Sequence, residues 1–375
     1  MTIRGAVIRI IASLGAIAFS FGVSAIALLL VDVSPAEAFG AMLSYGTRID
    51  SMISIVNRAV PLYMSAIAVA VGFQMGLFNI GVEGQYRIAM LIAAYVGAVV
   101  SLPAVLHVLV ILLTAMATGA LWASIAALLK ATRGVHEVIS TIMLNFIATG
   151  LGAWLLATHL REEVEGGLNV RTATIPESGH MPSLNPMLEL FGVTVPGGSD
   201  LHGFVVIAAI AGTAYYFLIW RTRVGYDLRA FGVNPGAAAA SGIGLKKMIF
   251  VSMAISGAFA GLVAMGPILG FYHRYSADIP IGLGFTGIAV ALVGRNRPIG
   301  MAAAALLFAF LNRSAQILDF RGIPKEIEVI VSGVIILTVV IAYEIARRVV
   351  MAQQVRDAAA QLHQADPAAE QEVAK

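Results

Sequence analysis

The chain has 375 residues, of which 59% are hydrophobic and 12% are charged, and its formal net charge at pH 7 is +3. This composition excludes a soluble globular protein, because several apolar runs reach the ~20 residues that a helix needs to cross a bilayer. The same long runs exclude a transmembrane β-barrel, and the absence of cysteine excludes disulfides, thiolate metal sites and a cysteine nucleophile.

The apolar runs, taken in chain order, predict an all-α, polytopic membrane protein with about ten transmembrane helices, some of them broken or short. The first run follows Arg4 and Arg9 and is longer than the apolar region of a signal peptide, so we expect an uncleaved first helix. The expected helices cover about residues 8–31, 57–78, 86–101, 104–129, 138–158, 203–220, 248–266, 281–294, 298–311 and 329–346.

The distribution of lysine and arginine predicts the orientation of these helices. Segment 221–247 is strongly basic and should face the cytoplasm, whereas the acidic, proline-containing segment 159–202 should form an external loop. Basic residues from Arg347 onward place the C-terminus inside, and both termini are then cytoplasmic. We expect one transmembrane domain over residues 1–348 and a cytoplasmic tail over residues 349–375.

The stretch Gly76–Gln85, which reads GLFNIGVEGQ, places polar side chains between two apolar runs. Its three glycines weaken a regular helix, and irregular backbone at membrane depth is tolerated where it lines a cavity or is buried in protein. These features favour a solute pathway; the alternative is an ordinary cytoplasmic turn with Glu83 in water. If Glu83 lies in the bilayer, we expect it to pair with Arg87 one helical turn onward.

A second glycine-rich interruption, Gly282–Gly287, breaks the apolar pattern in the C-terminal half. Two such interruptions in corresponding positions point to a duplicated transporter core. Elsewhere, Gly257 and Gly261 form a pair of small residues four apart, which predicts close contact between two helices.

Within the basic segment, residues 231–243 predict a turn, a short alanine-rich helix and a glycine stop. Asn234 is placed to cap that helix, Pro235 to occupy its first turn and Gly242 to end it. A short helix between two membrane helices suits docking into a groove on a partner, and the alternative is a plain connector at the membrane surface. The sequence has no Walker A pattern and no histidine spacing typical of a metal site.

Four motifs resemble those of permease subunits of bacterial ABC importers for simple sugars, branched-chain amino acids and nucleosides. The resemblance covers nearly the whole chain from about residue 50 onward and is strongest to the nucleoside branch. The motifs are Gly76–Gln85, Gly134–Asn145, Gly232–Ile243 and Gly284–Gly294, the last followed by Arg295-Asn296-Arg297-Pro298.

The resemblance implies a permease of the bacterial inner membrane that works with several partners. These are an ABC ATPase with two fused domains, a second and non-identical permease subunit, and an external solute-binding lipoprotein of the basic-membrane-protein type. ATP and magnesium would bind to the ATPase, and this chain would carry no cofactor. The resemblance also implies a coupling helix within residues 232–243, with contacts to the ATPase expected from Gly232, Asn234, Pro235, Ser241 and Gly242.

A nucleoside is flat, uncharged and rich in hydrogen-bonding groups, so its pathway needs amides, hydroxyls and apolar walls. For Asn145 the alternative is a hydrogen bond between helices, and for Glu83 an ion pair that fixes the third helix is preferred to solute contact. The residues predicted to form the pathway are Asn79, Gln85, Asn145 and Thr286 as polar groups, Phe78 and Phe285 as walls, and Glu83.

Two other classes of function compete with an ATP-driven importer. An ion- or proton-coupled secondary carrier would use Glu83 as its titrating group and would need no ATPase. An intramembrane enzyme would need a cluster of histidine and acidic side chains at membrane depth, and the predicted helices hold almost none. The predicted docking helix favours the importer over both.

Overall fold

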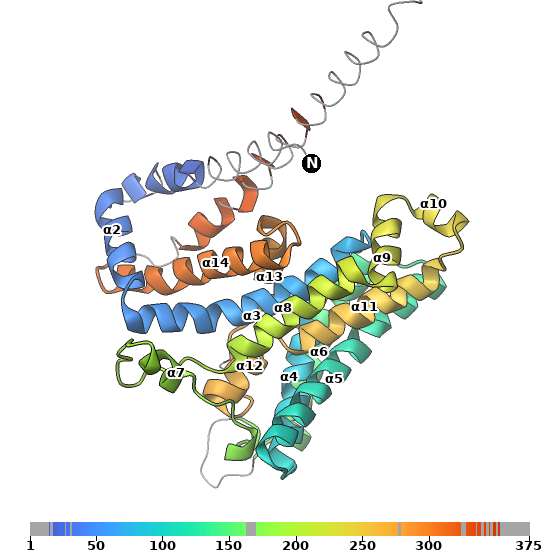
Figure 1. Ribbon diagram of the computed structural model, residues 1–375, viewed down its shortest axis with the longest axis horizontal. Helices are drawn as coiled ribbons and strands as arrows, with labels where there is room; N and C mark the ends of the chain where they lie inside the picture. Colours follow the sequence, from blue (N-terminus) through green and yellow to red (C-terminus); the bar gives the residue numbers. More distant parts are fainter. Residues whose placement is uncertain are drawn as a thin grey trace, which may run out of the picture. The chain divides into compact units, whose positions relative to one another are not determined.

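A computed structural model describes residues 15–352 except 16, 17, 27, 31, 163–169, 277, 278, 324–327, 335, 339, 340, 343, 344, 346, 347, 350 and 351. The described residues are mostly helical and contain no β-strand, only two isolated bridges (Figure 1). They fall into two compact units, one of Met42–Ser314 and one of Met1–Ala41 with Ala315–Lys375. Each unit is described by itself.

The larger unit holds most of the helices. In chain order, they are α3 (Ile49–Gln74), α4 (Val82–Val99), α5 (Ala104–Arg133), α6 (Glu137–Leu155) with the π-helical turn η1 (Leu156–Leu160), the 3-10 turn η2 (Glu177–Gly179), α7 (Asn185–Leu190), α8 (Phe204–Arg221), α9 (Arg223–Val233), α10 (Pro235–Ala240), α11 (Leu245–Gly261), α12 (Met265–Pro267) with the π-helical turn η3 (Ile268–Tyr272), and α13 (Leu283–Val293). Helices α2 (Pro35–Gly46) and α14 (Pro298–Asp319) each continue along the chain from one unit into the other.

Among the described residues, 6 helical segments are long and apolar enough to cross a membrane. The expectation of about ten crossings therefore stays a prediction, and the first and last expected helices, 8–31 and 329–346, lie partly outside the described residues. The 6 segments are Ile49–Gln74, Ala104–Arg133, Glu137–Leu160, Phe204–Arg221, Leu245–Tyr272 and Pro298–Asp319.

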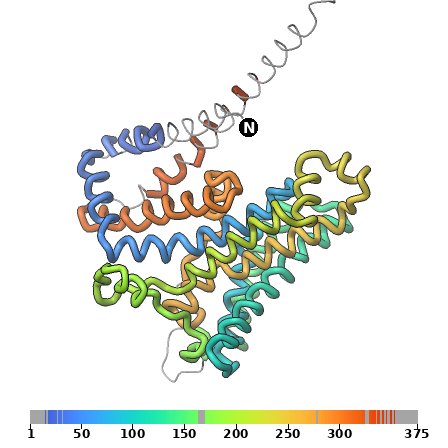
Figure 2. Tube along the Cα trace, in the orientation of Figure 1, coloured from blue at the N-terminus to red at the C-terminus, as the bar shows by residue number. Residues whose placement is uncertain are grey.

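Helix α3 is the centre of the larger unit. Its residues from Ala66 to Val71 are completely buried, and α8, α11 and α13 all pack against it (Figure 2). Such complete burial is typical of a helix surrounded by other helices rather than by lipid. By contrast, α5 keeps large apolar side chains such as Val105 exposed, as a lipid-facing helix does.

Helices α5 and α11 approach closely along a line of glycines. A Cβ atom added to Gly119 would lie 2.2 Å from the Gly257 carbonyl oxygen, and one added to Gly261 would lie 2.0 Å from that of Ala115. Both distances are shorter than any van der Waals contact, so only glycine allows this approach. The close contact predicted from Gly257 and Gly261 is confirmed.

The smaller unit contributes part of α2 and short helical segments near both chain ends. Within it, the rings of Phe21 and Phe39 meet edge to face with centroids 5.3 Å apart, and the Ser24 hydroxyl donates to the Ser20 carbonyl at 2.7 Å. The predicted tail, 349–375, lies almost wholly outside the described residues.

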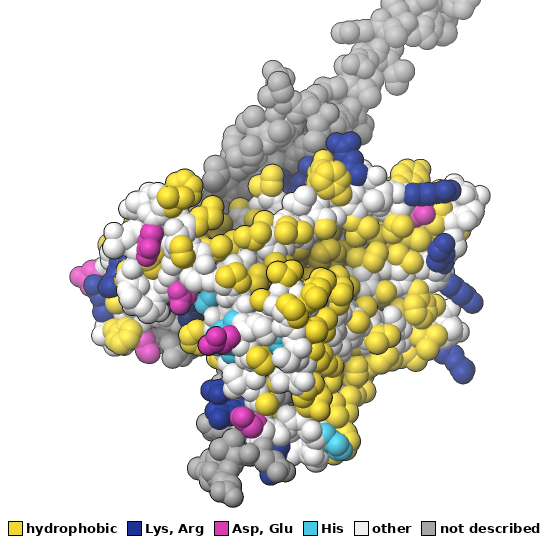
Figure 3. Space-filling model, turned by 60° about the horizontal axis from the view of Figure 1, so that its bottom comes forward, with side chains coloured by type: hydrophobic (Ala, Val, Ile, Leu, Met, Phe, Trp, Pro, Cys, Tyr) yellow, Lys and Arg dark blue, Asp and Glu magenta, His cyan; other side chains and the backbone are white. Residues whose placement is uncertain are grey.

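Figure 3 shows a broad hydrophobic band across the larger unit, with lysine and arginine side chains gathered at the end that holds α9 and α10. Basic residues at one end of an apolar band are typical of the cytoplasmic side of a membrane protein.

Candidate solute pathway at two broken helices

The backbone between α3 and α4, residues 75–81, has no regular helix. Gly76 ends α3 with φ +75°, a left-handed conformation that glycine adopts without strain. Parts of this segment are nevertheless buried: Leu77 is 5% exposed and Asn79 is 0% exposed. Its polar backbone groups must therefore be satisfied by neighbouring protein groups.

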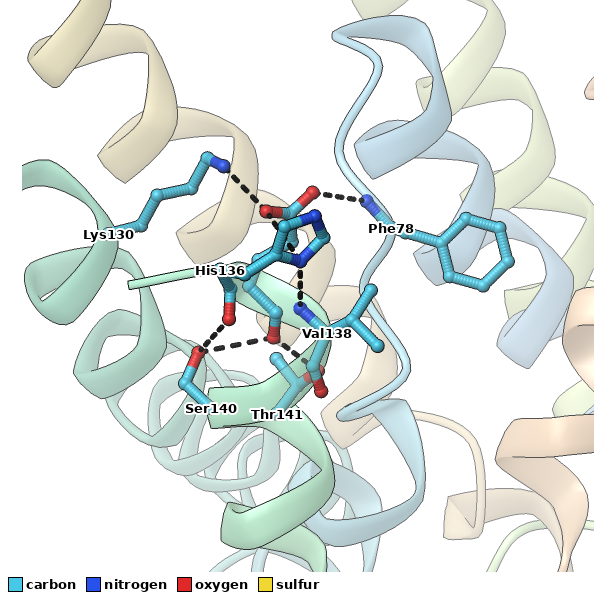
Figure 4. Close-up of polar contacts among 7 residues, drawn as sticks. Phe78, Lys130, His136, Val138, Ser140 and Thr141 are labelled. Carbon is cyan, nitrogen blue, oxygen red and sulfur yellow. Dashed lines mark hydrogen bonds and ion pairs between the residues drawn. The ribbon is translucent and has the colours of Figure 1, made fainter. Parts of the chain in front are cut away.

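Helix α6 supplies the first of these groups. The Glu137 carboxylate lies between two donors, the backbone N–H of Phe78 at 3.3 Å and the Lys130 ammonium at 2.5 Å (Figure 4). The carboxylate is nearly buried, and its α6 backbone is fixed by Thr141, whose hydroxyl donates to the Glu137 carbonyl at 2.7 Å. Glu137 thus fixes the entry of the chain into the buried segment.

Two turns further along α6, Asn145 holds the same segment. Its Nδ2 donates to the Ile80 carbonyl at 3.1 Å, and its Oδ1 accepts from the Gly84 N–H at 2.8 Å. Eight residues of helix rise by about 12 Å, so the segment follows α6 from its first residue into the interior of the apolar span. Both predicted roles of Asn145 require an inward-facing amide, and here that amide is bonded to backbone.

Asn79 and Gln85 form a reciprocal pair of amides. Asn79 Nδ2 donates to Gln85 Oε1 at 3.1 Å, and Gln85 Nε2 donates to Asn79 Oδ1 at 3.0 Å. Asn79 Nδ2 also donates to Ser256 of α11 at 2.8 Å, and the Ser256 hydroxyl donates to the Ala68 carbonyl of α3 at 2.6 Å. Both side chains are at most 1% exposed, so their amides connect three helices through the broken segment.

Glu83 binds the N-terminus of α13. Its Oε1 accepts from the Gly282 N–H and from the Tyr86 hydroxyl, and its Oε2 accepts from the Gly284 N–H, each at 2.9 Å. The first N–H groups of a helix have no partner within it, and the helix dipole favours a negative charge there. The expected ion pair with Arg87 is therefore wrong: the Arg87 guanidinium instead donates to the Thr149 hydroxyl at 3.0 Å.

The absence of a side chain at Gly284 makes this contact possible. A Cβ atom there would lie 2.5 Å from the backbone nitrogen of Glu83. One turn onward, a Cβ on Gly287 would lie 1.9 Å from the Ser65 hydroxyl of α3. The two glycine-rich interruptions are far apart in sequence and meet in the fold. The first supplies the Glu83 carboxylate, and the second supplies the backbone N–H groups that the carboxylate binds.

The remaining predicted pathway residues lie beside this junction. The Thr286 hydroxyl donates to the Gly282 carbonyl at 3.1 Å, and Phe285 on the same first turn of α13 is 51% exposed. Phe78 is 37% exposed, and its ring contacts that of Phe73 with centroids 4.9 Å apart. These two phenylalanines leave apolar surface open next to a buried polar network, and their contact with a solute stays a prediction.

Sequence reasoning missed several residues of this network. Glu137 lies inside one of the quoted motifs and follows Lys130 by 7 residues, across the turn that joins α5 and α6, which was a usable signal for a paired carboxylate. Ser256 and Tyr86 had no such signal, because a serine or a tyrosine in an apolar helix is common. Within the described part of the chain, no cluster of histidine and acidic residues suits a metal ion.

The predicted docking helix is α10, and its predicted boundaries are confirmed. Asn234 Oδ1 accepts from the Ala237 N–H at 3.0 Å, Pro235 occupies the first turn, and Gly242 follows the helix with φ +83°. Gly232, just before it, packs against the Gln74 carbonyl at the end of α3. Apart from Ala238, the helix is exposed.

The segment from Thr172 to His202 bonds to η3 and to the residues that follow it. The His180 and His273 rings stack with centroids 3.6 Å apart, and the Ile175 N–H donates to the His273 carbonyl at 2.8 Å. Burial lowers the pKa of His273, and the neighbouring His180 and His202 lower it further. Burial also lowers the pKa of His202, although Asp200 opposes that effect.

An apolar helical bundle in which an irregular, buried segment meets the N-terminus of a short helix is the architecture of a membrane transporter. Comparison with known proteins identifies which kind. The chain belongs to the family described as "Branched-chain amino acid transport system / permease component", which matches residues 51–340.

Three relatives illustrate the similarity. The guanosine ABC transporter permease protein NupP of Bacillus subtilis is 38% identical over 292 residues, which cover 77% of this chain and 81% of NupP. The glucose ABC transporter permease protein TsgB13 of Haloferax volcanii is 33% identical over 327 residues, or 85% and 83% of the two chains. The nucleoside ABC transporter permease protein NupB of Lactococcus lactis is 29% identical over 346 residues, or 89% and 92%.

Family membership settles the general role. The protein is a permease component of an ABC transporter and a multi-pass protein of the plasma membrane, and ATP hydrolysis takes place on a separate subunit. The similarity to simple-sugar and nucleoside permeases expected from the motifs is confirmed.

Proposed function

We propose that this permease carries a nucleoside, or a related simple sugar, into the cytoplasm. The observation that carries the proposal is the similarity along most of the chain to permeases named for guanosine and nucleosides, with glucose as the named solute of another relative. The buried junction fits an uncharged solute, because the Glu83 carboxylate is occupied by backbone N–H groups rather than open to a cationic ligand.

The proposed complex contains a second, non-identical permease, an ATPase with two fused domains that binds ATP and magnesium, and an external lipoprotein that delivers the solute. Support for a non-identical pair comes from Bacillus subtilis, where the guanosine permeases NupP and NupQ are both similar to this chain. No cofactor is assigned to this chain.

The proposed coupling element is α10 with its flanking residues Gly232, Asn234, Pro235, Ser241 and Gly242. Two features support it. The helix projects from the basic end of the bundle with nearly every residue exposed, and its predecessor α9 ends against the last turn of α3 (Figure 1). A push on α10 would thus reach α3 directly beside the irregular segment.

In the proposed cycle, ATP binding closes the ATPase pair and shifts the permease between inward- and outward-open populations, because the nucleotide binds one state better than the other. Asn79, Gln85, Glu83 and Asn145 keep the broken segment and α13 in place. Phe78, Phe285 and Thr286 line the adjacent path of the solute.

The proposed topology has about ten crossings, both termini in the cytoplasm and an external segment 159–202. It can be tested with single cysteines, because the chain has none of its own. The exposed residues Thr194 and Ser241 are suitable sites. Thr194→Cys should react with a membrane-impermeant maleimide in intact cells, whereas Ser241→Cys should react only after the membrane is opened. Labelling of both from outside would refute this orientation.

The function is tested by uptake in proteoliposomes that contain both permeases and the ATPase, with the lipoprotein added outside. We expect labelled nucleoside to accumulate only with ATP inside and to be unaffected by a protonophore. Accumulation by this chain alone, driven by an ion gradient and abolished by the protonophore, would instead establish the secondary-carrier alternative.

A further inference from the structure

Arg87 is a charged side chain that lies between two helices of the larger unit, α4 and α6. It lies in the second turn of α4, is partly exposed, and donates from Nη1 to the Thr149 hydroxyl of α6 at 3.0 Å. No carboxylate within the described part of the chain forms an ion pair with it. The carboxylate of its expected partner, Glu83, instead accepts hydrogen bonds from the backbone N–H groups at the start of α13.

The position of Thr149 gives the depth of this charge. Thr149 is twelve residues after Glu137 and eleven before Leu160, the two ends of the apolar span that contains α6. At the rise of a helix this is about 16–18 Å from either end. Arginine side chains near the ends of a span can extend their charge to the interface, but one at this depth cannot.

A charge in mid-membrane is costly against lipid and is retained where it faces protein or a polar pathway. The surface around Arg87 is open: Thr149 is exposed, and a Cβ atom at the adjacent Gly150 would contact nothing within 4 Å. Burial raises the pKa of the nearby Tyr275 hydroxyl, and the positive charge of Arg87 opposes that rise. Beyond its bond to Thr149, the guanidinium thus has further N–H donors that face an open, partly polar surface.

We propose that Arg87 contacts the transported solute midway across the membrane and binds the edge of a 6-oxopurine nucleoside through the adjacent acceptors O6 and N7. A guanidinium presents two parallel N–H donors at the spacing of these two acceptors, which is the commonest way in which arginine recognises guanine. Adenine presents an acceptor next to an amino donor at the same edge and cannot accept both bonds. Arg87 therefore favours guanosine and inosine over adenosine.

This inference rests on the proposed function, since it names the solutes of the same pathway. It is tested in the reconstituted complex by the ratio of initial uptake rates for inosine and adenosine, with excess lipoprotein. The lipoprotein is the same for every variant, so its own selectivity cancels when ratios are compared. We expect Arg87→Met to reduce the inosine preference by about tenfold, because one bidentate contact is worth roughly 1–3 kcal/mol.

Arg87→Gln distinguishes solute contact from a purely structural role of Arg87, because a structural role would not change which nucleoside is preferred. A glutamine amide pairs with N6 and N7 of adenine, so this variant should shift the preference toward adenosine. Arg133→Gln, the same substitution at an exposed arginine that ends α5, is the matched control and should leave the ratio unchanged. Yield and co-purification of the second permease are recorded for each variant.

Three outcomes would overturn the inference. One is a ratio and a total uptake that are both unchanged in the two Arg87 variants, and another is uptake reduced by the same factor for every nucleoside. The third is loss of the second permease from the purified complex, which would place Arg87 in the subunit interface. If the wild-type complex moves no nucleoside at all, the proposed function itself fails, and this result is distinguishable from the other three.

Discussion

The contact between Glu83 and α13 leads to a quantitative prediction for Glu83→Gln. The substitution keeps the shape of the side chain and removes its charge. The carboxylate accepts three hydrogen bonds, from two backbone N–H groups at the start of α13 and from the Tyr86 hydroxyl. A glutamine has one oxygen, so its NH₂ group must face at least one of these donors.

The expected loss of stability follows from these contacts. A hydrogen bond to a charged group contributes about 1.5–3 kcal/mol, against about 0.5–1.5 kcal/mol for a neutral one, and an unsatisfied buried donor costs about 1–3 kcal/mol. The summed loss is about 3–5 kcal/mol before any relaxation. With about 2–4 °C for each kcal/mol in a large domain, the melting temperature should fall by roughly 6–12 °C even at the lower figure.

Thermal stability is measured on the purified complex in detergent, by the fraction that remains monodisperse on size-exclusion chromatography after heating. Glu189→Gln, at an exposed position in α7, is the matched control and should melt with the wild type. ATP-driven uptake is measured in parallel, and we expect Glu83→Gln to reduce it at temperatures where the complex is still intact. A Glu83→Gln complex that melts within about 1 °C of the wild type would refute the claim that this carboxylate holds α13.

Three further predictions concern other parts of the chain. Gly257→Leu should prevent α5 and α11 from approaching and abolish the folded complex, whereas Gly150→Ala on the open face of α6 should change the yield and melting temperature little. Gly242→Arg should uncouple ATP hydrolysis from uptake, while Gly242→Ala, which bears the same left-handed backbone strain without the bulk, should remain coupled; equal uptake by both would count against docking by α10. His273 binds a proton less well in the fold than in the unfolded chain, so the stability from its neutral form is present above pH ~6.5 and is lost as the pH falls below that. The melting temperature of the wild type should therefore fall more between pH 7.5 and 5.5 than that of His273→Asn, which tolerates the positive φ, and equal falls would contradict this assignment.

The sequence predicts those features that depend on neighbouring residues. Glycines mark the ends of α3 and α10, asparagine and proline mark the start of α10, and paired small residues mark a helix contact, because each effect acts over one turn. The partner of Glu83 could not be found this way. The local rule for residues four apart selects Arg87, whereas the real donor at Gly282 is 199 residues away in sequence.

The same limit applies to the amides. Asn79 is separated from Ser256 by 177 residues, and nothing near either residue indicates the other. The sequence shows that polar groups in an apolar chain need partners, and it identifies which residues have this need. It does not show whether the partner is a solute, a side chain or the backbone of another helix. For Asn79, Gln85, Glu83 and Asn145, the structure supplies protein partners.

These partners restrict how the permease can move. Separating α13 from α4 would break both backbone bonds to Glu83 at once, at a free-energy cost of several kcal/mol, which is comparable to or larger than the differences between functional states. We therefore expect the start of α4 and the whole of α13 to move as one body during transport. The change in backbone angles must then occur where no such bonds hold the chain. A Cβ atom added to Gly76 would have no neighbour within 4 Å, so the backbone there has room to rotate. Gly76 is therefore the best-placed hinge beside α9 and α10.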